Sequence, residues 1–526
     1  MSRNSLSQYK LILFTSIFFT IFYNFSFFGN VTKDYPFEGS NIFYIISLAI
    51  VQIIFTNIVF AIFASKYTTK FLLILTLFIS SYTAYFMDVY HVVIDDNMIR
   101  NALQTNLAES SDLFSFKLVI YVLLLGILPS YIVYKIEIDY EDIKTELFRK
   151  LKSIFISLAI IGIILFSFSK FYTSFFREHK SLRYHINPSF WLYNINYVII
   201  KNYTSHTITL EKIGNDAKIT SSENEKRKIM ILVVGEATRA DRFSLNGYER
   251  ETNPLLKNED VINFTNMYSC GTSTAESVPC MFSIFGRENY SYKKGISTEN
   301  VVDVLNKTNE VSILWRDNNS DSKGVALRVD FQDYRTSKTN TICDDECRDE
   351  GMIVGLDKYI EQHKNKNILI VLHQMGNHGP AYYKRYVKEF EKFAPICKTN
   401  QLEACSKDEV ENAYDNAVLY TDYFLSKVIN FLKPYSQNFE TSMFYISDHG
   451  ESLGENGLYL HGMPYFIAPD AQKHVASVMW LGNGKKENIE KPYSQDNLFH
   501  TLLGFYGVKT SVYKEDMDIL NDYKKH

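Results

Sequence analysis

The sequence has no excess of charge of either sign and no sign of low complexity. Its 526 residues include 55 Lys and Arg against 59 Asp and Glu, which gives a formal net charge of −4. Because nucleic-acid binding usually requires a strongly basic surface, we expect no nucleic-acid partner. A disordered chain is also excluded, since 46% of the residues are hydrophobic and only 22% are charged.

Charged residues are missing from five long stretches in the first third of the chain. These stretches are rich in Ile, Leu and Phe, and they cover residues 11–28, 42–64, 71–87, 118–134 and 153–169. Each is long enough to cross a bilayer, which takes about 17–25 apolar residues. A cleavable signal peptide is not indicated, because no small-residue cleavage site follows the first stretch. We predict a transmembrane domain of five helices over residues 1–175. The alternative is that one of the stretches is re-entrant or buried, and the third is the first candidate for this.

Lys and Arg in the short loops predict the orientation of these helices, because cytoplasmic loops are enriched in both residue types. The basic segments are the N-terminus and the loops after the second and fourth stretches, with Arg3, Lys10, Lys66, Lys70, Lys135, Lys144, Arg149, Lys150 and Lys152. The acidic loop after the third stretch should face outside. Five spans that start in the cytoplasm place everything after residue 170 outside. Residues 176–225 are predicted to be a linker that could hold a helix along the membrane surface.

Cysteine is absent from the first 269 residues, and all six cysteines lie in the region predicted to be outside. They are near neighbours in three pairs: Cys270 and Cys280, Cys343 and Cys347, Cys397 and Cys405. An even number of locally paired cysteines on the oxidising side of a membrane favours three short disulfides. A zinc ribbon is disfavoured because no Cys-x-x-Cys occurs. Spacing alone leaves the connectivity open.

The last two-thirds of the chain alternates apolar runs with helical patterns. Continuous apolar runs, typical of strands buried on both faces, occur at residues 229–234, 311–315, 368–372, 443–446 and 475–481. The clearest helix is predicted over residues 409–432. This alternation predicts an α/β domain over residues 226–526, with a mainly parallel sheet flanked by helices. In such a sheet, ligands bind at the carboxyl ends of the strands.

Two of the predicted strands end in side chains that can bind a metal. Glu236 follows the first apolar run, and Asp448 and His449 follow the fourth. A hydroxyl from the cysteine-bracketed loop could be a further ligand, and a metal beside a Thr or Ser hydroxyl makes it a nucleophile. Each residue has an ordinary alternative, such as a helix cap for Glu236, a turn for the loop hydroxyls and a surface position for His461. The combination favours a metal site, which by ligand type suits Mn²⁺ as well as zinc.

Longer motifs surround these residues. They cover residues 234–241, 269–275, 277–283, 315–324, 373–380 and 447–457, the last beginning Ser447-Asp448-His449-Gly450-Glu451. In this order they resemble the motifs of the lipid A phosphoethanolamine transferases, which include the mobile colistin-resistance enzymes and belong to the alkaline phosphatase/sulfatase superfamily. The resemblance covers the whole chain. It implies a multi-pass protein of the bacterial inner membrane with a sulfatase-like catalytic domain in the periplasm.

The resemblance also implies roles for the matching residues. Thr274 matches the nucleophile that becomes modified with phosphoethanolamine. The zinc ligands match Glu236, Thr274, Asp448 and His449, with room for a second zinc near His378 and His461. Positions around the substrate phosphate match Thr272, Asn319, Ser320, Lys323, His378 and His461. Lys323 and the two histidines could supply charge or protons to a phosphate in transfer.

Two further features carry over from the same resemblance. Positions implicated in binding the lipid substrate match Asn101, Thr105 and Glu109. The three family disulfides match the three cysteine pairs, although the loop between Cys343 and Cys347 is tighter than the family spacing.

The predicted function is that of a zinc-dependent transferase with a ping-pong mechanism. Thr274 would attack the phosphate of phosphatidylethanolamine, release diacylglycerol and pass phosphoethanolamine to lipid A or the lipopolysaccharide core, and polymyxin or colistin resistance could follow. His378 or His461 would protonate the leaving oxygen. The expected partners are the donor lipid, the lipopolysaccharide acceptor and membrane lipids, for a chain that is expected to be a monomer.

Three alternatives belong to other classes. A phosphoglycerol or other phospho-group transferase of the lipoteichoic acid synthase type shares the five spans, but the three cysteine pairs and the run at residues 277–283 argue against it. A sulfatase is disfavoured because Cys280 is not followed by Pro-Ser-Arg, which formylglycine formation needs. A non-enzymatic receptor is disfavoured by the intact set of metal-type side chains.

Overall fold

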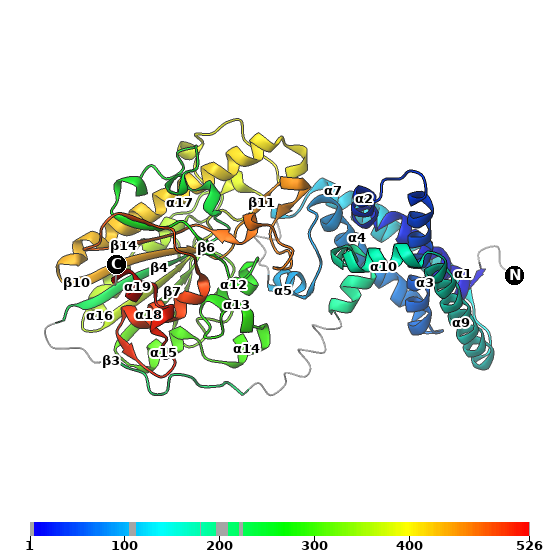
Figure 1. Ribbon diagram of the computed structural model, residues 1–526, viewed down its shortest axis with the longest axis horizontal. Coiled ribbons are helices and arrows are strands. Elements are labelled where there is room, and N and C mark those ends of the chain that lie inside the picture. Colours follow the sequence, from blue (N-terminus) through cyan, green and yellow to red (C-terminus); the bar gives the residue numbers. More distant parts are fainter. Residues whose placement is uncertain (1–4, 105–111, 179, 196–208, 220–224, 525–526) are drawn as a thin grey trace. The chain divides into compact units, whose positions relative to one another are not determined.

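Figure 1 shows a computed structural model of the chain, which describes residues 5–104, 112–178, 180–195, 209–219 and 225–524. The chain divides into two compact units. The first consists of Met1–Ile99 and Phe114–Tyr203, and the second of Arg100–Leu113 and Thr204–His526.

The first unit contains apolar helices of membrane-spanning length. Within the described residues, four helical segments are long and apolar enough to cross a membrane: α3 (Asn41–Phe63), α4 (Thr69–Val89), α9 (Ile143–Ser167) and the segment Phe116–Lys135, which comprises α7 (Phe116–Tyr121), η1 (Val122–Ile127) and α8 (Leu128–Lys135). A fifth candidate is the pair α1 (Gln8–Phe22) and α2 (Phe25–Asp34), bent by 56°. The third predicted stretch is therefore one continuous helix, and the sharp bend that a re-entrant segment would need lies in the first stretch.

The second unit is built around an eight-stranded sheet with the order β15-β5-β14-β10-β4-β9-β7-β8. Five neighbouring strands are parallel to one another, namely β10 (Phe439–Ser447), β4 (Arg227–Gly235), β9 (Asn367–His373), β7 (Val311–Asp317) and, at the edge of the sheet, β8 (Asp330–Asp333). The remaining strands are β14 (Ser477–Leu481), β5 (Val261–Phe264) and β15 (Glu487–Ile489). The prediction of an α/β domain with a mainly parallel sheet is confirmed.

The last predicted strand differs from the other four. The apolar run at residues 475–481 is divided between β13 (His474–Val475), which pairs with β6 (Met267–Tyr268), and β14, which runs antiparallel to β10. Ala476 lies between the two strands, and its N–H donates to the carbonyl of Thr238. A contact with a distant loop, which no local pattern reveals, therefore divides the run.

Helices cover both faces of the central sheet (Figure 1). The long helix α17 (Lys407–Leu432) lies on one face, and its first turn is closed by a capping box between Ser406 and Glu409. On the other face, α15 (Val301–Lys307) and α18 (Leu498–Phe505) join a cluster of buried side chains that includes Met230, Leu232 and Val234 of β4. Burial on both faces explains the continuous apolar runs of the central strands.

The central parallel strands end at the same edge of the sheet. In the pairing register, Ser447 lies opposite Gly235, and Asp317 opposite His373. The loops that follow these strands therefore begin side by side, which positions Glu236 and Asp448 next to each other.

Candidate active site

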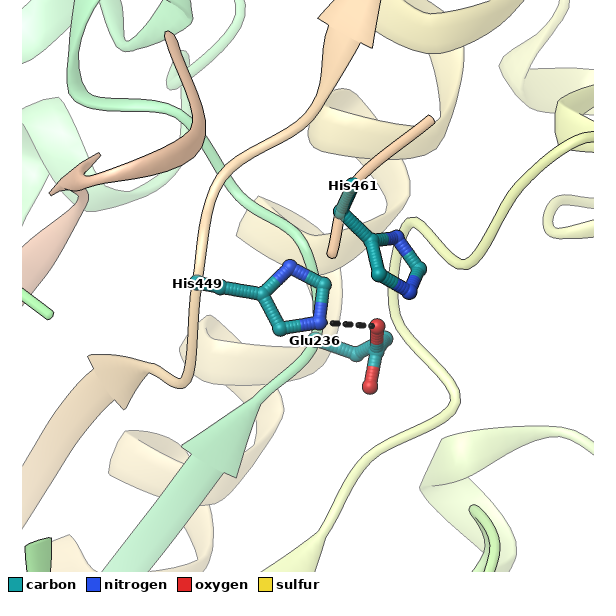
Figure 2. A group of neighbouring side chains, drawn as sticks. All are labelled: Glu236, His449 and His461. Atoms are coloured by element: carbon teal, nitrogen blue, oxygen red, sulfur yellow. Dashed lines mark ion pairs between the residues drawn. The ribbon is translucent and has the colours of Figure 1, made fainter. Parts of the chain in front are cut away.

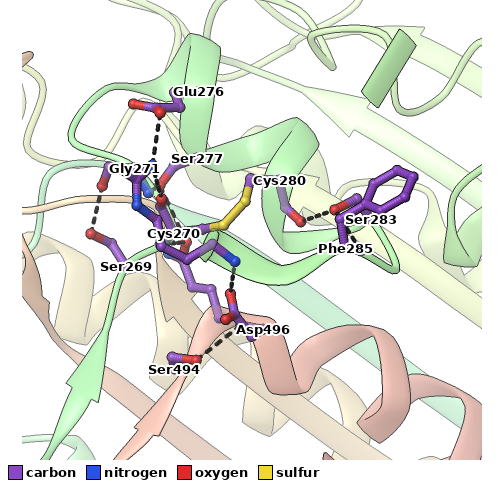
Figure 3. Close-up of a disulfide and its surroundings, with 12 residues drawn as sticks. Ser269, Cys270, Gly271, Glu276, Ser277, Cys280, Ser283, Phe285, Ser494 and Asp496 are labelled. Carbon is purple, nitrogen blue, oxygen red and sulfur yellow. Dashed lines mark hydrogen bonds and ion pairs between the residues drawn. A yellow bond between two sulfur atoms is a disulfide. The ribbon is translucent and has the colours of Figure 1, made fainter. Parts of the chain in front are cut away.

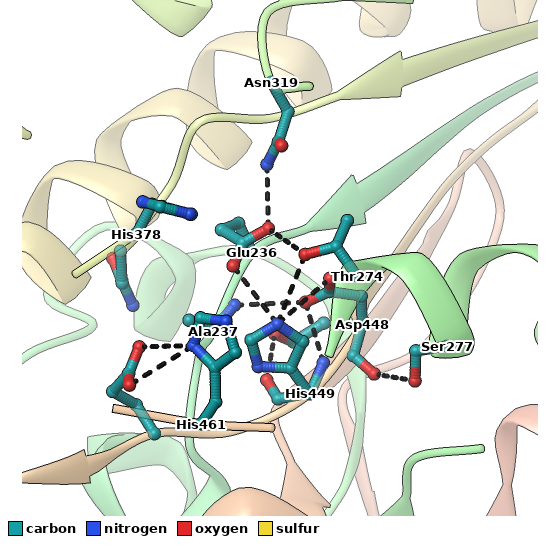
Figure 4. Close-up of polar contacts among 12 residues, drawn as sticks. Glu236, Ala237, Thr274, Ser277, Asn319, His378, Asp448, His449 and His461 are labelled. Carbon is teal, nitrogen blue, oxygen red and sulfur yellow. Dashed lines mark hydrogen bonds and ion pairs between the residues drawn. The ribbon is translucent and has the colours of Figure 1, made fainter. Parts of the chain in front are cut away.

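Four predicted metal ligands converge at this edge of the sheet (Figure 4). Figure 2 shows two of them, Glu236 and His449, beside His461. The Oγ1 of Thr274 lies 3.1 Å from Oε2 of Glu236 and 3.3 Å from Nε2 of His449. The same His449 nitrogen is 3.3 Å from Oε1 of Glu236 and 3.5 Å from Oδ2 of Asp448. All four side chains are buried. Two carboxylates, one imidazole and one hydroxyl thus face a common point.

Hydrogen bonds fix which atoms of these side chains face that point. The N–H groups of Ala237 and His449 donate to Oδ1 of Asp448, at 3.1 and 2.7 Å. The Nδ1 of His449 lies 2.8 Å from the carbonyl of Gly450. Because a carbonyl only accepts, this contact places a proton on Nδ1, so that Nε2, which faces the carboxylates, is the ring nitrogen that can bind a metal once its own proton has left.

The arrangement fits a metal ion. Within the described part of the chain, neither Oε1 of Glu236 nor Oδ2 of Asp448 has a hydrogen-bonding partner, although both are buried. Buried charged oxygens are costly unless a cation or donor satisfies them. These two oxygens and the Nε2 of His449 are the ligand types that zinc and other transition metals bind.

The charges of the site also favour the binding of a metal ion. Burial and the adjacent charge of Glu236 raise the pKa of Asp448 to about 6. Burial alone would raise the pKa of Glu236, but His449 keeps it below its usual range. Burial alone would likewise lower the pKa of His449, yet the charges of Asp448 and Glu236 raise it to about 10. The two carboxylates together favour a cation beside them, a role that His449 fills when protonated and that a metal ion could take over.

Thr274 is held at the start of a short helix, α12 (Thr274–Met281). The preceding Ser273 is extended, with φ of −149°, so the chain turns into the helix at Thr274. The Cys270–Cys280 disulfide joins the loop before Thr274 to the end of this helix (Figure 3). The structure also joins Cys343 to Cys347 and Cys397 to Cys405.

Two more histidines line the site. The His461 ring centroid lies 4.1 Å from that of His449 and 6.0 Å from that of His378. Glu236, His449 and His461 form a group of potential metal ligands whose donor atoms all lie within 4.8 Å of one another. His461 is only 8% exposed, so the alternative that it is a surface residue is wrong.

Glu451 is a site residue that the sequence argument missed. Its two carboxylate oxygens lie 3.2 and 3.3 Å from Nδ1 of His461, and the carboxylate is fully buried. Its position directly after Asp448-His449-Gly450 was the available signal. The contact orients the His461 ring, so that Nε2 is the atom left for substrate or metal.

The remaining predicted residues are placed as follows. Asn319 donates to Oε2 of Glu236 at 2.7 Å, which makes it a direct neighbour of the metal ligands. The Thr272 hydroxyl donates to the carbonyl of Met463 at 2.6 Å. The Nζ of Lys323 donates to the carbonyl of Ser320 at 3.1 Å. Asn101 lies in α5 (Asp96–Gln104), whereas Thr105 and Glu109 fall outside the described residues.

A buried Thr hydroxyl among carboxylates and imidazoles, at the edge of a mainly parallel sheet, fits an enzyme that carries out metal-assisted group transfer or hydrolysis. Residues 228–508 match the Sulfatase family, and residues 52–203 match the family described as Phosphoethanolamine transferase EptA/EptB.

Relatives that align over nearly the whole chain identify the type of enzyme more closely. The chain is 43% identical to the phosphatidylethanolamine transferase Mcr-1 of Escherichia coli, with 98% of this chain and 97% of the relative aligned. It is 38% identical to the phosphoethanolamine transferase EptA of Escherichia coli K12, over 100% and 98% of the two chains. The structure of the lipooligosaccharide phosphoethanolamine transferase EptA from Neisseria meningitidis superposes with a TM-score of 0.94 at 34% identity, covering 98% of this chain and 99% of that one.

The chain belongs to the phosphoethanolamine transferase family. It is an enzyme and an integral membrane protein whose C-terminal domain is periplasmic. The family, fold and localisation expected from the sequence are thus confirmed.

Proposed function

We propose that this enzyme transfers phosphoethanolamine from phosphatidylethanolamine to lipid A or the lipopolysaccharide core through a covalent intermediate on Thr274. The observation that carries the proposal is the Thr274 hydroxyl, which lies between Glu236 and His449 at 3.1 and 3.3 Å. The names of two relatives, phosphatidylethanolamine transferase and lipooligosaccharide phosphoethanolamine transferase, support this donor and this type of acceptor.

The metal is proposed to be zinc, held by Glu236, Thr274, Asp448 and His449. When bound, it supplies positive charge that lowers the pKa of the Thr274 hydroxyl and neutralises phosphate oxygens. Asn319 keeps Oε2 of Glu236 in place. A second zinc near His378 and His461 is the alternative to a role of these rings as proton donors.

The reaction is proposed to take place in two displacements. In the first, the Thr274 oxygen attacks the donor phosphorus, the bond from phosphorus to the glycerol oxygen breaks, and diacylglycerol leaves with a proton. In the second, an acceptor oxygen attacks the same phosphorus, the bond from phosphorus to the Thr274 oxygen breaks, and the proton of the acceptor hydroxyl passes to Thr274. His461, which Glu451 orients, and His378 are the candidates for delivering the proton, and Lys323 for stabilising charge on the phosphate.

The division of the chain is part of the proposal. Residues 1–175 are proposed to anchor the enzyme and residues 176–225 to link the anchor to the catalytic domain at residues 226–526. Asn101, Thr105 and Glu109 are proposed to contact the donor lipid, and Thr272 and Ser320 to support the phosphate site.

Mass spectrometry provides the test. Lipopolysaccharide from cells that express the gene should carry added phosphoethanolamine, and the purified protein should carry the same group on Thr274. The added ammonium should lower susceptibility to polymyxins. Phosphoglycerol on Thr274, or unmodified lipopolysaccharide together with another modified acceptor, would contradict the assignment.

A further inference from the structure

The catalytic geometry depends on two loops from distant parts of the second unit. One loop carries Thr274 and begins at Cys270, and the other carries the metal-ligand residues Asp448 and His449. The site requires that these loops keep a fixed separation, because the Thr274 oxygen must reach the metal and the substrate phosphorus at once. The side chains that join the two loops therefore set the reacting distances.

A single buried amide joins them. Gln495 lies in η13 (Gln495–Asn497) and is fully buried. Its Nε2 donates to the carbonyls of Ser447 and Asp448, both at 2.7 Å. Its Oε1 accepts the N–H of Cys270 at 2.7 Å. One side chain thus holds the backbone of both loops.

A second side chain completes this connection. The Ser277 hydroxyl, on the same helix as Thr274, donates to the carbonyl of Asp448 at 2.6 Å and accepts the N–H of Gly271 at 2.8 Å (Figures 3 and 4). It also lies 3.2 Å from Oε1 of Gln495. The Asp448 carbonyl is therefore the point where both connections meet.

We propose that Gln495 is a positioning residue that sets the distance between Thr274 and the metal ligands Asp448 and His449. The role requires an amide, since only Asn or Gln offers two N–H donors and an acceptor at the end of one side chain. The hydrogen bonds of the Gln495 amide run to the backbone of the two loops and not to the side chains of Thr274, Asp448 or His449. Gln495 acts through the backbone of Asp448 and Cys270, and the inference rests on the proposed roles of Thr274 and the metal ligands.

The structure supplies a matched control. Asn416 of α17 is a fully buried amide whose Nδ2 donates to the carbonyl of Phe393 at 2.9 Å. Its Oδ1 accepts the N–H groups of Lys392 and Phe393, each at 2.9 Å. Asn416→Asp therefore removes a buried donor from one backbone carbonyl, as Gln495→Glu does from two, but its partners lie outside the Thr274 and Asp448 loops.

The experiment compares Gln495→Glu, Gln495→Met and Asn416→Asp in the full-length chain in detergent. We expect both Gln495 variants to lower kcat about a hundredfold while KM for the donor stays within about twofold, because misplacement of a reacting group by ~1 Å has that effect. Metal affinity, measured by competition with a chelator, should fall about tenfold. Asn416→Asp should show a similar drop in thermal midpoint with near-normal kcat and metal affinity.

Two results would overturn the proposal. One is a Gln495→Glu variant that keeps both kcat and metal affinity near the wild-type values. The other is an Asn416→Asp variant whose kcat and metal affinity fall as far as those of the Gln495 variants at the same thermal midpoint. General destabilisation would then explain the losses in all of these variants. If the wild-type chain modifies neither Thr274 nor lipopolysaccharide, the proposed function fails, and the metal-affinity comparison still decides the role of Gln495.

Discussion

At the scale of single residues, the adjacent hydroxyls of Ser273 and Thr274, the proposed nucleophile, have different surroundings. Thr274 contacts Glu236 and His449, whereas the buried Ser273 hydroxyl makes no hydrogen bond to any residue that the structure describes. Thr274→Ala should lower transfer by about three orders of magnitude or more, because it removes the nucleophile. Ser273→Ala should leave transfer and thermal midpoint almost unchanged. Transfer from a fluorescent phosphatidylethanolamine measures both, and near-normal transfer by Thr274→Ala would require another nucleophile.

A buried ion pair behind the site makes stability depend on pH. Asp317 accepts hydrogen bonds from Nε1 of Trp315 at 3.0 Å and from the N–H groups of Asn319 and Asp321, and its Oδ2 lies 2.8 Å from Nδ1 of His373. Burial opposes the charge on both groups, but each partner offsets it. The pKa of Asp317 is therefore lowered from 3.8, and that of His373 is raised from 6.5.

The signs of these two shifts define the expected pH window. The contribution of Asp317 is present above pH 3.8 and is lost as the pH falls through its lowered pKa. The contribution of His373 is present below pH 6.5 and is lost as the pH rises through its raised pKa. Asp317→Asn should lower the free energy of unfolding by about 3 kcal/mol between pH 3.8 and pH 6.5, and by less at alkaline pH. Thermal midpoints of both proteins from pH 4 to 9 test this; a difference that does not narrow above neutrality would contradict it.

At the scale of elements, two disulfides of similar loop length should have different effects. The Cys270–Cys280 and Cys397–Cys405 bridges span 10 and 8 residues, so each should contribute about 2–3 kcal/mol by restricting the unfolded chain. Only the first encloses Thr274. Replacing both Cys270 and Cys280 with Ser should therefore lower transfer much more than replacing both Cys397 and Cys405, at comparable thermal midpoints. A Cys270/Cys280 variant with full activity and a far lower midpoint would show that the bridge only stabilises the fold.

At the scale of the whole molecule, the number of membrane crossings depends on which side of the membrane the N-terminus and the C-terminal domain lie. Among the residues that the structure describes, four helical segments have membrane-spanning length, and α1 with α2 adds a fifth only if the bent pair crosses. The C-terminal domain is periplasmic, and the basic N-terminus is predicted to be cytoplasmic, so the number of crossings must be odd. We therefore expect α1 and α2 together to form a complete crossing.

Reporter fusions distinguish between four and five membrane crossings. A reporter that is active only in the periplasm should be inactive at the N-terminus and after Lys152, and active after Ser269. The fusion after Lys70 serves as a second cytoplasmic control. An active N-terminal fusion would mean that the bent pair is re-entrant and that only four helical segments cross.

The sequence by itself determined the features that depend on local pattern. Missing charge predicted the apolar helices, uninterrupted apolar runs predicted β4, β7, β9 and β10, and the motifs predicted that Glu236, Asp448, His449 and Thr274 share a site. Hydrophobic runs and strand-end residues carry this information because a buried parallel sheet imposes it on each segment separately. The same holds for the cysteine pairs, which are neighbours in the chain.

Only the tertiary structure decided the features that depend on distant partners. The bend between α1 and α2, the antiparallel direction of β14 and the contact between Glu451 and His461 have no local signature. Gln495 is the clearest case, because a single Gln before a short helix is unremarkable until its amide is seen between the Cys270 and Asp448 loops. The physical reason is that a polar side chain acquires its role from the donors and acceptors that folding places around it, and these come from segments far away in the sequence.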